Sequence, residues 1–414
     1  MKVLCVGSGA REHAIVRILA KNGATITAIM DKKNPGIIKL SKKVILTELK
    51  APWDLKGIKA DFCVIGPEGP LAEGLADYLQ EKHEIPCIGP CKALARLETS
   101  KVFARSLLAK HNIPGNPPFT ICSSSKDAMN FLQEYSEVAV KPDVLTGGKG
   151  VKVTGDHLKS KEEAIAYAED RIASDKVVII EQKLVGDEFT LQALWDGKTL
   201  TTMPLVQDFK RLLDGDKGPN TGSMGSYSRP DHELPFLSPT HINIAKSIMK
   251  KALLAAQKET NQIYRGILYG QFMLTSDGIY LIEFNCRYGD PEAMNVLSLL
   301  ESNSLEIYQQ MIDNSLNRAS FRSEATVCIY LVPRGYPNNP EKGLPIKIPP
   351  QARDSVFYAS VYEKDGTVYT TGSRALAVLG QAPSVPEARK KAYEMVTKFG
   401  EGLFHRTDIA AEID

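Results

Sequence analysis

The sequence predicts a multidomain protein of α/β and α+β class, with an N-terminal α/β domain built on a parallel sheet. Its 414 residues exceed one ordinary domain, and two to four domains are expected. Up to about residue 98, short apolar runs alternate with helical stretches, which is the pattern of a parallel sheet. From about residue 325, strand-like runs separated by turn residues and followed by one helix indicate a small α+β domain.

The composition is that of a globular protein, with 43% hydrophobic and 24% charged residues. A net charge of +2 argues against a nucleic-acid-binding protein, which usually carries a clear basic excess. No run approaches the ~20 apolar residues that cross a bilayer. The N-terminus enters a strand without the basic and apolar regions of a signal peptide. We therefore expect a cytoplasmic protein with no nucleic-acid or membrane partner.

The seven cysteines are odd in number and scattered, and most lie in apolar runs. Cys87 and Cys91 have no second cysteine pair or histidines to complete a zinc-site pattern. Buried free thiols, as in a reducing compartment, are therefore expected.

The N-terminal stretch has the order strand, glycine-containing loop, helix. Strands are expected at Lys2–Val6, Thr25–Met30 and Phe62–Ile65. The loop from Gly7 to His13 leads into a helix through Leu19. Ligand-binding loops of a parallel sheet lie at the carboxyl ends of its strands. The Gly7 loop and the loop Gly66–Pro70 are therefore expected at one sheet edge, with Glu68 near the Gly7 loop.

Two interpretations of Gly7–Gly9 stay open. With Asp31 at the end of the second strand, the pair is typical of a dinucleotide-binding loop whose acidic residue holds a ribose. The third glycine position, however, holds Glu12. Glycines and a helix N-terminus can also hold any phosphate. Arg11 and His13 would then add charge and hydrogen bonds, unless His13 is simply packed within its helix.

The middle of the chain begins with a helix capped by Thr99 or Ser100 and running to Lys110. Lys101 lies in its first turn, where a cation is unfavourable against the helix dipole, which hints at a ligand.

A strand at Val138–Pro142 carries Lys141 near its end, and Thr146–Gly150 and a second strand at Val151–Val153 follow. A Walker A loop needs Gly-Lys-Ser/Thr leading into a helix, and here a valine and a strand follow the last glycine. We expect instead a flap whose backbone N–H groups cover phosphates, with Lys141 and Lys149 as cations. A glycine turn of purely geometric origin is the alternative.

An apolar strand at Val177–Ile180 leads to Glu181. A free strand edge there would hydrogen-bond an adenine, and Glu188 would accept ribose hydroxyls. Gly218–Gly225 is rich in turn residues and predicts a loop, functional or disordered. The embedded Met224 argues against plain disorder.

Leu268–Thr275 and the stretch from Ile279 onward both alternate in polarity, and Ser276–Gly278 is a turn signal, so a β-hairpin is expected. A two-residue loop would oppose Glu283 to Phe272, a worse fit for a polar site, so a three-residue loop is preferred. The three-residue loop would pair Thr275 with Ile279. The same register sets two further pairs, Gln271 opposite Glu283 and Tyr269 opposite Asn285.

Glu283, Asn285 and Arg287 share one face of this hairpin if its second strand extends that far. A carboxylate, an amide oxygen and a guanidinium suit a metal-bound polyphosphate. Asp290 and Pro291 then read as the N-cap and first residue of a helix toward Leu300. An ordinary hairpin with a solvated polar face is the alternative.

The C-terminal region is expected to begin with a strand at Ala325–Leu331. Strands at Val356–Tyr362 and Thr367–Thr371 flank the turn Asp365-Gly366 and predict a hairpin. Ser384 and Glu387 form a capping-box pattern for a helix to about Phe399. Arg374 is expected to be structural.

In this order, the basic strand end, the glycine-rich flap, the strand to Glu181 and the polar hairpin resemble the ATP-grasp ligases. Within that superfamily, four runs resemble the glycinamide ribonucleotide synthetases, also called phosphoribosylamine–glycine ligases. They are Gly9–His13, Gly66–Pro70, Gly218–Gly222 and Glu283–Pro291. The resemblance covers nearly the whole chain. It implies an ATP-grasp core with a mobile flap subdomain and ligation of glycine to 5-phosphoribosylamine with ATP, through glycyl phosphate, in de novo purine biosynthesis.

The resemblance also implies roles for individual residues. The implied ATP-binding residues are Lys101, Lys141, Gly148, Lys149, Gly150, Glu181, Leu184 and Glu188. The implied ligands of Mg²⁺ or Mn²⁺ are Glu283, Asn285 and Gln271. The implied substrate-binding residues are Gly9, Arg11, Glu12, His13, Glu68, Asp208, Pro219, Asn220, Thr221 and Gly222. The implied catalytic residues are Arg287, which would steady the transferring phosphoryl group, Asp290 and Lys210.

The family pattern is not matched everywhere. Gln271 stands where many ATP-grasp enzymes have a glutamate, and a neutral amide neutralises less metal charge. The flap reads Thr-Gly-Gly-Lys-Gly where Ala-Ala-Gly-Lys-Gly is common. Gly372–Arg374 reads Gly-Ser-Arg where Gly-Gly-Arg is common.

The resemblance divides the chain into four parts: an N-terminal domain of residues 1–98, an ATP-grasp core of 99–117 plus 187–317, a flap subdomain of 118–186, and a C-terminal domain of 325–414. A monomer or homodimer is expected. The alternatives are another purine-pathway ATP-grasp ligase, a nicotinamide-dependent oxidoreductase, and a nucleotide-binding protein without catalysis.

Overall fold

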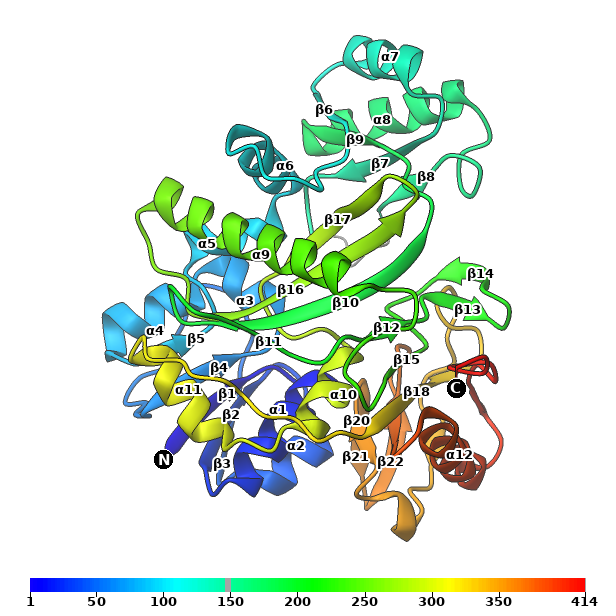
Figure 1. Cartoon of the computed structure of the whole chain (residues 1–414). Helices are drawn as coiled ribbons and strands as arrows, with labels where there is room; N and C mark the ends of the chain where they lie inside the picture. The colour runs from blue at the N-terminus through cyan, green and yellow to red at the C-terminus, as the bar shows by residue number, and fades with distance from the viewer. Residues whose placement is uncertain (146–149, 414) are drawn as a thin grey trace.

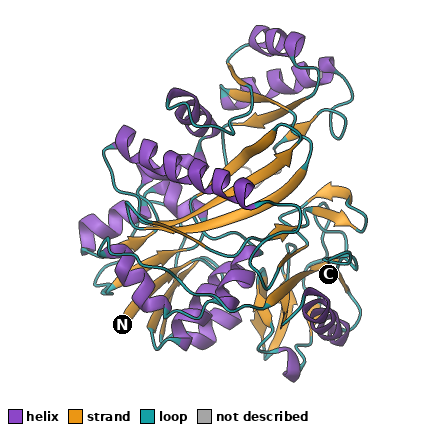
Figure 2. Ribbon diagram, in the orientation of Figure 1, coloured by secondary structure: helices purple, strands orange, loops and turns teal. Residues whose placement is uncertain are grey.

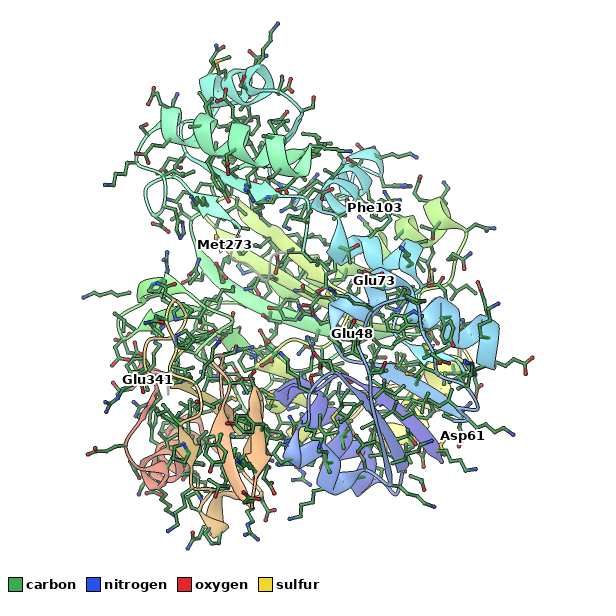
Figure 3. The ribbon with its side chains drawn as sticks, turned by 180° about the vertical axis from the view of Figure 1, so that it is seen from behind. Glu48, Asp61, Glu73, Phe103, Met273 and Glu341 are labelled. Atoms are coloured by element: carbon green, nitrogen blue, oxygen red, sulfur yellow. The ribbon has the colours of Figure 1, made fainter. Side chains whose placement is uncertain are left out.

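The computed structural model describes residues 1–145 and 150–413. Figure 1 shows four parts: the N-terminal sheet at lower left, a small sheet with two helices at the top, long strands beneath α9 in the middle, and the C-terminal sheet at lower right. Figure 2 shows helices beside the strands in each part. The view from behind places the labelled Asp61 on the N-terminal part and Glu341 on the C-terminal part, with Met273 above them (Figure 3).

The N-terminal part is an all-parallel sheet with strand order β3-β2-β1-β4-β5. Its strands are β1 (Lys2–Val6), β2 (Thr25–Met30), β3 (Lys43–Leu46), β4 (Phe62–Ile65) and β5 (Cys87–Ile88). Its helices are α1 (Ala10–Lys21), α2 (Pro35–Leu40), α3 (Glu68–Glu73), α4 (Leu75–His83) and α5 (Lys92–Thr99). The three strands predicted here are confirmed. Because β1 and β4 are neighbours, the loops at Gly7 and Gly66 start side by side.

The top part follows α6 (Lys101–Lys110), which Ser100 caps by accepting a hydrogen bond from the Phe103 N–H, as predicted. Its strands are β6 (Phe119–Cys122), β7 (Val138–Pro142), β8 (Lys152–Val153) and β9 (Val178–Gln182), and its helices are α7 (Ser125–Glu134) and α8 (Lys161–Asp175). Its buried residues form a hydrophobic core separate from the two clusters that fill the other parts.

The predicted strand pair around the glycine-rich turn is confirmed, because β7 and β8 pair antiparallel. Residues 146–149, which include the predicted Gly148 and Lys149, lie outside the described residues. The expected free edge beside Glu181 is wrong. β9 lies between β6 and β7 and is hydrogen-bonded on both sides, so its backbone groups are already paired.

The middle part is an antiparallel sheet with order β11-β10-β16-β17. Its strands are β10 (Asp187–Trp195), β11 (Leu200–Thr202), β16 (Gly266–Thr275) and β17 (Gly278–Asn285). The long helix α9 (Pro239–Thr260) lies across these strands in Figure 1. The helices α10 (Glu292–Leu299) and α11 (Ser304–Ile312) follow β17.

The hairpin of β16 and β17 has the predicted register at its polar end, where Gln271 pairs with Glu283 and Tyr269 with Asn285. The predicted three-residue loop is wrong, since Thr275 pairs with Gly278. Two residues form the loop, the length that the twist of antiparallel strands favours. A β-bulge opposite Gln271 and Phe272 then adds the residue that brings the register back to the predicted pairs.

The C-terminal part is a mixed assembly of strands from two segments of the chain. Its main sheet has the order β12-β15-β18-β23-β20, with β24 paired to β18. The strands are β12 (Gln207–Asp208), β15 (Gly225–Ser228), β18 (Ala325–Pro333), β20 (Val356–Tyr358), β23 (Leu376–Ala382) and β24 (Leu403–Phe404). A smaller sheet holds β19 (Pro345–Ile346), β21 (Val361–Lys364) and β22 (Thr367–Thr370), and the helices are α12 (Val385–Val396) and the 3-10 turns Pro350–Ala352 and Thr397–Phe399.

Two predicted elements differ in this part. Val356–Tyr362 is not one strand, because β20 and β21 belong to different sheets; the hairpin about Asp365-Gly366 is confirmed and joins β21 to β22. The run predicted as a loop contains β14 (Lys217–Asn220), which pairs with β13 (Arg211–Leu213) in a two-stranded ribbon. Ser384 caps α12 by accepting from the Glu387 N–H.

All seven cysteines are free, and five are buried, as predicted. In the described part of the chain, no helix combines the length and the apolar character needed to cross a membrane.

Candidate active site

The polar face of the β16–β17 hairpin brings the predicted metal ligands Glu283 and Asn285 together. Asn285 Nδ2 lies 3.5 Å from Glu283 Oε1, and the Glu283 side chain is exposed. β17 ends at Asn285, so Arg287 lies beyond the strand. Its Nη2 nevertheless donates to Asn285 Oδ1 at 3.2 Å. The predicted trio therefore forms one cluster, although the strand carries only two of its members.

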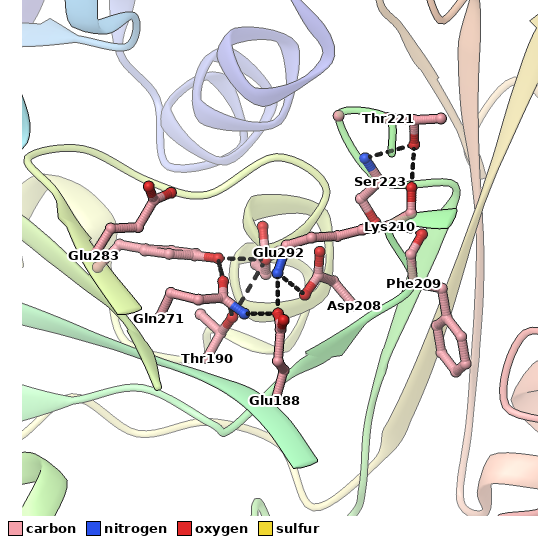
Figure 4. Close-up of polar contacts among 12 residues, drawn as sticks. Glu188, Thr190, Asp208, Phe209, Lys210, Thr221, Ser223, Gln271, Glu283 and Glu292 are labelled. Carbon is pink, nitrogen blue, oxygen red and sulfur yellow. Dashed lines mark hydrogen bonds and ion pairs between the residues drawn. The ribbon is translucent and has the colours of Figure 1, made fainter. Parts of the chain in front are cut away.

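Gln271 is buried beneath this cluster, with 1% of its surface exposed. Its Oε1 accepts a hydrogen bond from the Tyr269 hydroxyl, and its Nε2 donates to Glu188 Oε2 at 2.9 Å (Figure 4). Both ends of the amide are thus engaged within the protein. The arrangement makes Gln271 a support for Glu188, and its role as a metal ligand stays a prediction.

Glu188, Asp208 and Lys210 form an ion-pair cluster between β10 and β12. Lys210 Nζ contacts Glu188 Oε2 and lies 3.6 Å from Asp208 Oδ1 (Figure 4). Burial alone would lower the pKa of Lys210, but the two carboxylates outweigh it and raise that pKa above its usual range. Burial raises the pKa of Asp208, which Lys210 offsets only in part. The lysine is therefore held as a cation among acids.

Glu292, at the start of α10, adds another buried acid to this cluster. Its Oε1 accepts from the Tyr269 hydroxyl at 3.1 Å and from Thr190 Oγ1 at 3.4 Å. Burial, and then the charge of Asp208, raise the pKa of Glu292 to about 7. Sequence patterns did not single out this residue, although it directly follows the Asp-Pro pair of the family motif.

The predicted substrate loop lies against the same lysine. The Thr221 N–H and hydroxyl both donate to the Lys210 carbonyl at 2.8 Å (Figure 4). Pro219 and Asn220 are exposed on the ribbon strand β14. The Gly222 carbonyl accepts from Arg374 Nη1. Of the four predicted residues, Thr221 and Gly222 are thus fixed to other parts of the site.

One predicted ATP-binding cation, Lys141, contacts Glu181 on β9 together with Arg105. Lys141 Nζ lies 2.6 Å from Glu181 Oε2, and Arg105 Nε and Nη2 donate to the two oxygens at 2.7 and 2.9 Å. Burial would raise the pKa of Glu181, but Arg105 and Lys141 lower it to about 2. Arg105 also donates to the carbonyls of Leu281 and Ile282. It therefore ties α6 and β9 to the hairpin.

Sequence reasoning missed Arg105. A usable signal was present, because Arg105 follows Lys101 by four residues and so lies on the same face of α6. Lys101 Nζ donates to the Pro142 carbonyl at 3.0 Å. Burial lowers the pKa of Lys101, while Glu283 opposes the shift.

Two further predicted ATP-binding residues, Gly150 and Leu184, lie in the top part. The Gly150 carbonyl accepts from the Tyr167 hydroxyl at 2.8 Å. Leu184 is half-buried just after β9.

The two N-terminal loops meet at Glu12. Its Oε2 accepts from the Gly9 N–H at 2.7 Å and its Oε1 from Arg11 Nε at 2.6 Å. A Cβ at Gly66 would lie 2.2 Å from Glu12 Oε1, and one at Gly7 2.5 Å from Glu12 Cγ. The glutamate therefore occupies the space that both glycines leave. Arg11 Nη2 lies 3.8 Å from Glu68, which confirms that Glu68 is close to the Gly7 loop.

His13 is the predicted residue that points away from this meeting place. It is 2% exposed, its Nδ1 accepts from the Tyr358 N–H at 3.0 Å, and its ring contacts Phe357. Burial and Arg17 hold its pKa well below the usual range. The packed-helix alternative is the one that the structure supports for His13.

Asp290 is not the predicted N-cap. Pro291 occupies that position without a side-chain cap, and α10 begins at Glu292. The Asp290 carboxylate instead pairs with Arg374 Nη2 at 3.1 Å and accepts from the Tyr330 hydroxyl at 2.5 Å. A charged partner and a hydroxyl from the C-terminal sheet replace the N–H groups that a cap would bind.

Arg287 completes the site by joining the hairpin to the N-terminal part. Its Nη2 lies 3.0 Å from Glu98 Oε1, and its Nε lies 3.5 Å from Glu68 Oε2. Burial would lower its pKa, but Glu98 and Glu68 raise it. Glu98 was not singled out from the sequence. Its partner is nearly two hundred positions further along the chain, at Cys286 and Arg287, and no local pattern reports such a contact.

The chemistry of this site combines the cations Lys101 and Lys141 with a carboxylate and amide pair at Glu283 and Asn285. Such oxygen donors are those that Mg²⁺ binds together with phosphate oxygens. In residues 1–145 and 150–413, no group of three or more His, Cys, Asp or Glu side chains is arranged to hold a metal by itself.

Comparison with known proteins finds similarity along nearly the whole chain. Models of the phosphoribosylglycinamide synthetase N domain, ATP-grasp (A) domain and C domain match residues 1–98, 99–293 and 326–412. The phosphoribosylamine–glycine ligase of Methanosarcina barkeri is 45% identical over 417 residues, which cover 99% of this chain and 96% of the relative. That of Methanocella arvoryzae is 45% identical over 421 residues, covering 100% and 96%.

Solved structures show the same likeness. The crystal structure of phosphoribosylamine–glycine ligase from Thermotoga maritima is 32% identical, with a TM-score of 0.84 over 99% of this chain and all of that one. The biotin carboxylase domain of Hydrogenobacter thermophilus 2-oxoglutarate carboxylase, solved with MgADP and bicarbonate, shares the fold at 16% identity, with a TM-score of 0.72 over 97% of this chain and 91% of its own. The nicotinamide alternative finds no support. The chain belongs to the phosphoribosylglycinamide synthetase family, whose central domain is an ATP-grasp domain.

Proposed function

We propose that the protein ligates glycine to 5-phosphoribosylamine with ATP, giving glycinamide ribonucleotide, ADP and phosphate in de novo purine biosynthesis. One structural observation carries the proposal beyond family membership. Glu283, Asn285 and Arg287 meet in one cluster that borders the Lys210 site on one side and the N-terminal loops on the other. A site for phosphoryl transfer thus lies between candidate sites for the two substrates to be joined.

The chemistry requires activation of the glycine carboxylate. Oxide is a poor leaving group, so ATP first converts the carboxylate to glycyl phosphate, and the amine of phosphoribosylamine then displaces phosphate. The protein contributes positioning and neutralisation of charge. Lys101 and Lys141 would hold ATP phosphates, and Arg287 would stabilise the negative charge on the phosphoryl group in flight. Arg105, through Glu181, would keep Lys141 in place.

The residues present fit a divalent cation. Glu283 is exposed, the only hydrogen bond of its carboxylate to another described residue is the 3.5 Å contact with Asn285 Nδ2, and both side chains offer hard oxygen atoms. We propose Mg²⁺, with Mn²⁺ as a substitute, held by Glu283, Asn285 and ATP oxygens. When bound, the ion would neutralise charge on the ATP phosphates. Gln271 remains a third candidate ligand, which would need its amide oxygen released from Tyr269.

Glycine and the amine substrate would lie on opposite sides of Arg287. The ion-pair cluster of Asp208 and Lys210, beside Thr221, offers both charges that a zwitterionic glycine needs. The Gly7–Gly9 loop with Arg11 and Glu68 would receive the phosphoribosyl group, because glycines and a helix N-terminus suit phosphate. Asp290 lines a pocket together with Ser8 and Gly9 and would contact the amine, while Arg374 holds the Asp290 carboxylate.

The decisive assay measures phosphate release by the purified protein with Mg-ATP, glycine and freshly generated phosphoribosylamine. Release should require all three substrates. Release that does not depend on glycine would refute this substrate assignment and favour another ATP-grasp carboxylate–amine ligase. Reduction of a nicotinamide cofactor would refute the class.

We further propose the four-part division into residues 1–98, 99–117 plus 187–317, 118–186 and 325–414. The separate core of the top part supports the third of these. The pairing of β12 and β15 with β18 means that residues 207–228 share a sheet with the fourth. We also propose a cytoplasmic location and a monomeric or homodimeric state, which cell fractionation and analytical ultracentrifugation would test.

A further inference from the structure

Glu98 makes two short contacts with the segment that follows β17, the strand that carries Glu283 and Asn285. It lies in the last turn of α5, and its side chain is 4% exposed. Oε2 accepts a hydrogen bond from the Cys286 backbone N–H at 2.6 Å, and Oε1 lies 3.0 Å from Arg287 Nη2. One carboxylate from the N-terminal part therefore holds both the main chain and the guanidinium directly after Asn285.

The buried position of the Glu98 carboxylate is unfavourable for the stability of the folded protein. A buried carboxylate loses its hydration, and negative charge near the C-terminal end of a helix is unfavourable against the helix dipole. Burial raises the pKa of Glu98 to about 7, and Arg287 opposes the shift. An apolar side chain at this position would avoid the cost, so the carboxylate has to be explained by what it holds.

The hydrogen bonds of Arg287 indicate what is held. Nη2 bonds Asn285 Oδ1 at 3.2 Å, and Nη1 donates to the Tyr288 carbonyl at 3.2 Å. The buried Nε makes no hydrogen bond in the described residues, and its nearest anion is Glu68 Oε2 at 3.5 Å. The guanidinium is thus held through its two terminal nitrogens.

We propose that Glu98 is a positioning residue for phosphoryl transfer: it orients Arg287 and the main chain at Cys286 so that Arg287 stays beside Asn285. The inference rests on the proposed function, since it assigns Glu98 to the same reaction. It adds that the N-terminal part supplies a group to phosphoryl transfer, beyond its expected place in binding the phosphoribosyl group.

The test compares Glu98→Gln with Glu81→Gln, an exposed acid on α4 of the same part. Glutamine retains the size of the side chain but loses the charge that orients the guanidinium. We expect Glu98→Gln to lower kcat for phosphate release by about tenfold or more, with the KM values for ATP and glycine within about threefold of the unmodified protein. Glu81→Gln should leave all three constants unchanged. Unchanged kcat in Glu98→Gln, or a loss confined to KM, would overturn the proposal.

A second comparison separates positioning from general stability. If Glu98 acts through Arg287, the double variant Glu98→Gln with Arg287→Gln should be no more than about twofold slower than Arg287→Gln alone. Losses that multiply would overturn the proposal. This comparison also serves if Glu98→Gln alone does not fold, because the double variant leaves no unpaired charge in the pair.

The two proposals fail in different ways. If the unmodified protein releases no phosphate with the three substrates, the proposed function fails. If it is active and Glu98→Gln matches it, only the role of Glu98 fails.

Discussion

Arg374 and Asp290 form an ion pair whose Nη2 and Oδ2 atoms lie 3.1 Å apart, although 84 positions separate them in the chain. Arg374 comes from the C-terminal part, where its guanidinium stacks on Tyr330 at 4.1 Å from the ring centre. Asp290 follows β17. The same guanidinium donates to the Gly222 and Ser223 carbonyls. One side chain therefore joins the C-terminal sheet, the substrate loop and the family motif.

Replacement of Arg374 tests this junction. Arg374→Lys keeps the charge but loses the planar fork that reaches Asp290 and two carbonyls at once. We expect the KM for phosphoribosylamine to rise about tenfold or more, with the KM for ATP changed by less than about threefold. Arg353→Lys, on an exposed arginine of the same part, is the control. Equal effects on both KM values would show that Arg374 acts on the whole fold.

Elements with a local signature were predictable from the sequence. Lys2–Val6, Thr25–Met30 and Phe62–Ile65 were found because buried strands of a parallel sheet are continuous apolar runs. The pairing of Gln271 with Glu283 was predicted from a three-residue loop, which was preferred because it sets polar residues opposite one another. The pairing is confirmed although that loop length is wrong. The predicted loop length was wrong because a β-bulge adds one residue to the second strand. A sequence pattern does not show whether an extra residue belongs to the loop or to a bulge.

The misses in the site have a common cause in long-range contacts. Asp290-Pro291 has the local pattern of a cap, but Arg374 and Tyr330, both from the C-terminal part, bind the carboxylate instead. Glu98 had no local signal, and the spacing of Arg105 from Lys101 indicated a shared helix face but no partner. The contacts of Glu98 with Cys286 and of Arg105 with Glu181 exist only in the folded chain. Polar side chains acquire their function from tertiary neighbours, which a single sequence does not display.

Because of Glu181, the free energy of unfolding should depend on pH in the acid range. Its pKa is lowered from 4.5 to about 2 by Arg105 and Lys141, so the folded state favours the charged form. The resulting stabilisation, about 3 kcal/mol, is complete above the unfolded pKa of 4.5 and is lost as pH falls from there toward 2. Glu181→Gln removes this titration and leaves two buried cations without their anion. Calorimetry should show a lower unfolding temperature for the variant at pH 7, with the difference narrowing below pH 4.5.

Glu137→Gln provides the matched control in the same part. Glu137 is 60% exposed and lies 3.5 Å from Lys183, so its ion pair is solvated and contributes less than about 1 kcal/mol. The unfolding temperature of Glu137→Gln should equal that of the unmodified protein at every pH. A pH-independent difference for Glu181→Gln would contradict the charged state assigned to Glu181.

Alanine should be tolerated at Gly69, in the first turn of α3, but not at Gly66, in the loop that precedes this helix. A Cβ at Gly66 would meet Glu12 Oε1 at 2.2 Å, whereas a Cβ at Gly69 meets nothing within 4 Å. Gly66→Ala must therefore displace Glu12 and the Gly9 N–H that it binds. We expect about a tenfold or greater rise in the KM for phosphoribosylamine in Gly66→Ala and no change in Gly69→Ala. Similar kinetics in both variants would show that the contact between Gly66 and Glu12 does not affect the binding of phosphoribosylamine.

The proposed role of Glu283 as a metal ligand can be tested by measuring turnover at increasing Mg²⁺ concentrations. Glu283 supplies the only carboxylate proposed as a ligand, so Glu283→Ala should show no measurable turnover at any Mg²⁺ concentration. Asp277→Ala removes an exposed acid at the tip of the same hairpin and should behave as the unmodified protein. Activity of Glu283→Ala that returns at saturating Mg²⁺ would refute the essential ligand role.

The geometry argues against Gln271 as a metal ligand. Its amide oxygen accepts a hydrogen bond from the Tyr269 hydroxyl, and its amide nitrogen donates one to Glu188. If it supports Glu188 without binding the ion, Gln271→Leu should raise the KM for ATP by about threefold or more while the Mg²⁺ concentration for half-maximal rate stays unchanged. A ligand role predicts the reverse, since loss of one oxygen donor weakens metal binding first. Titration of Mg²⁺ at fixed, saturating ATP separates these outcomes, and a shifted Mg²⁺ requirement would restore Gln271 to the metal site.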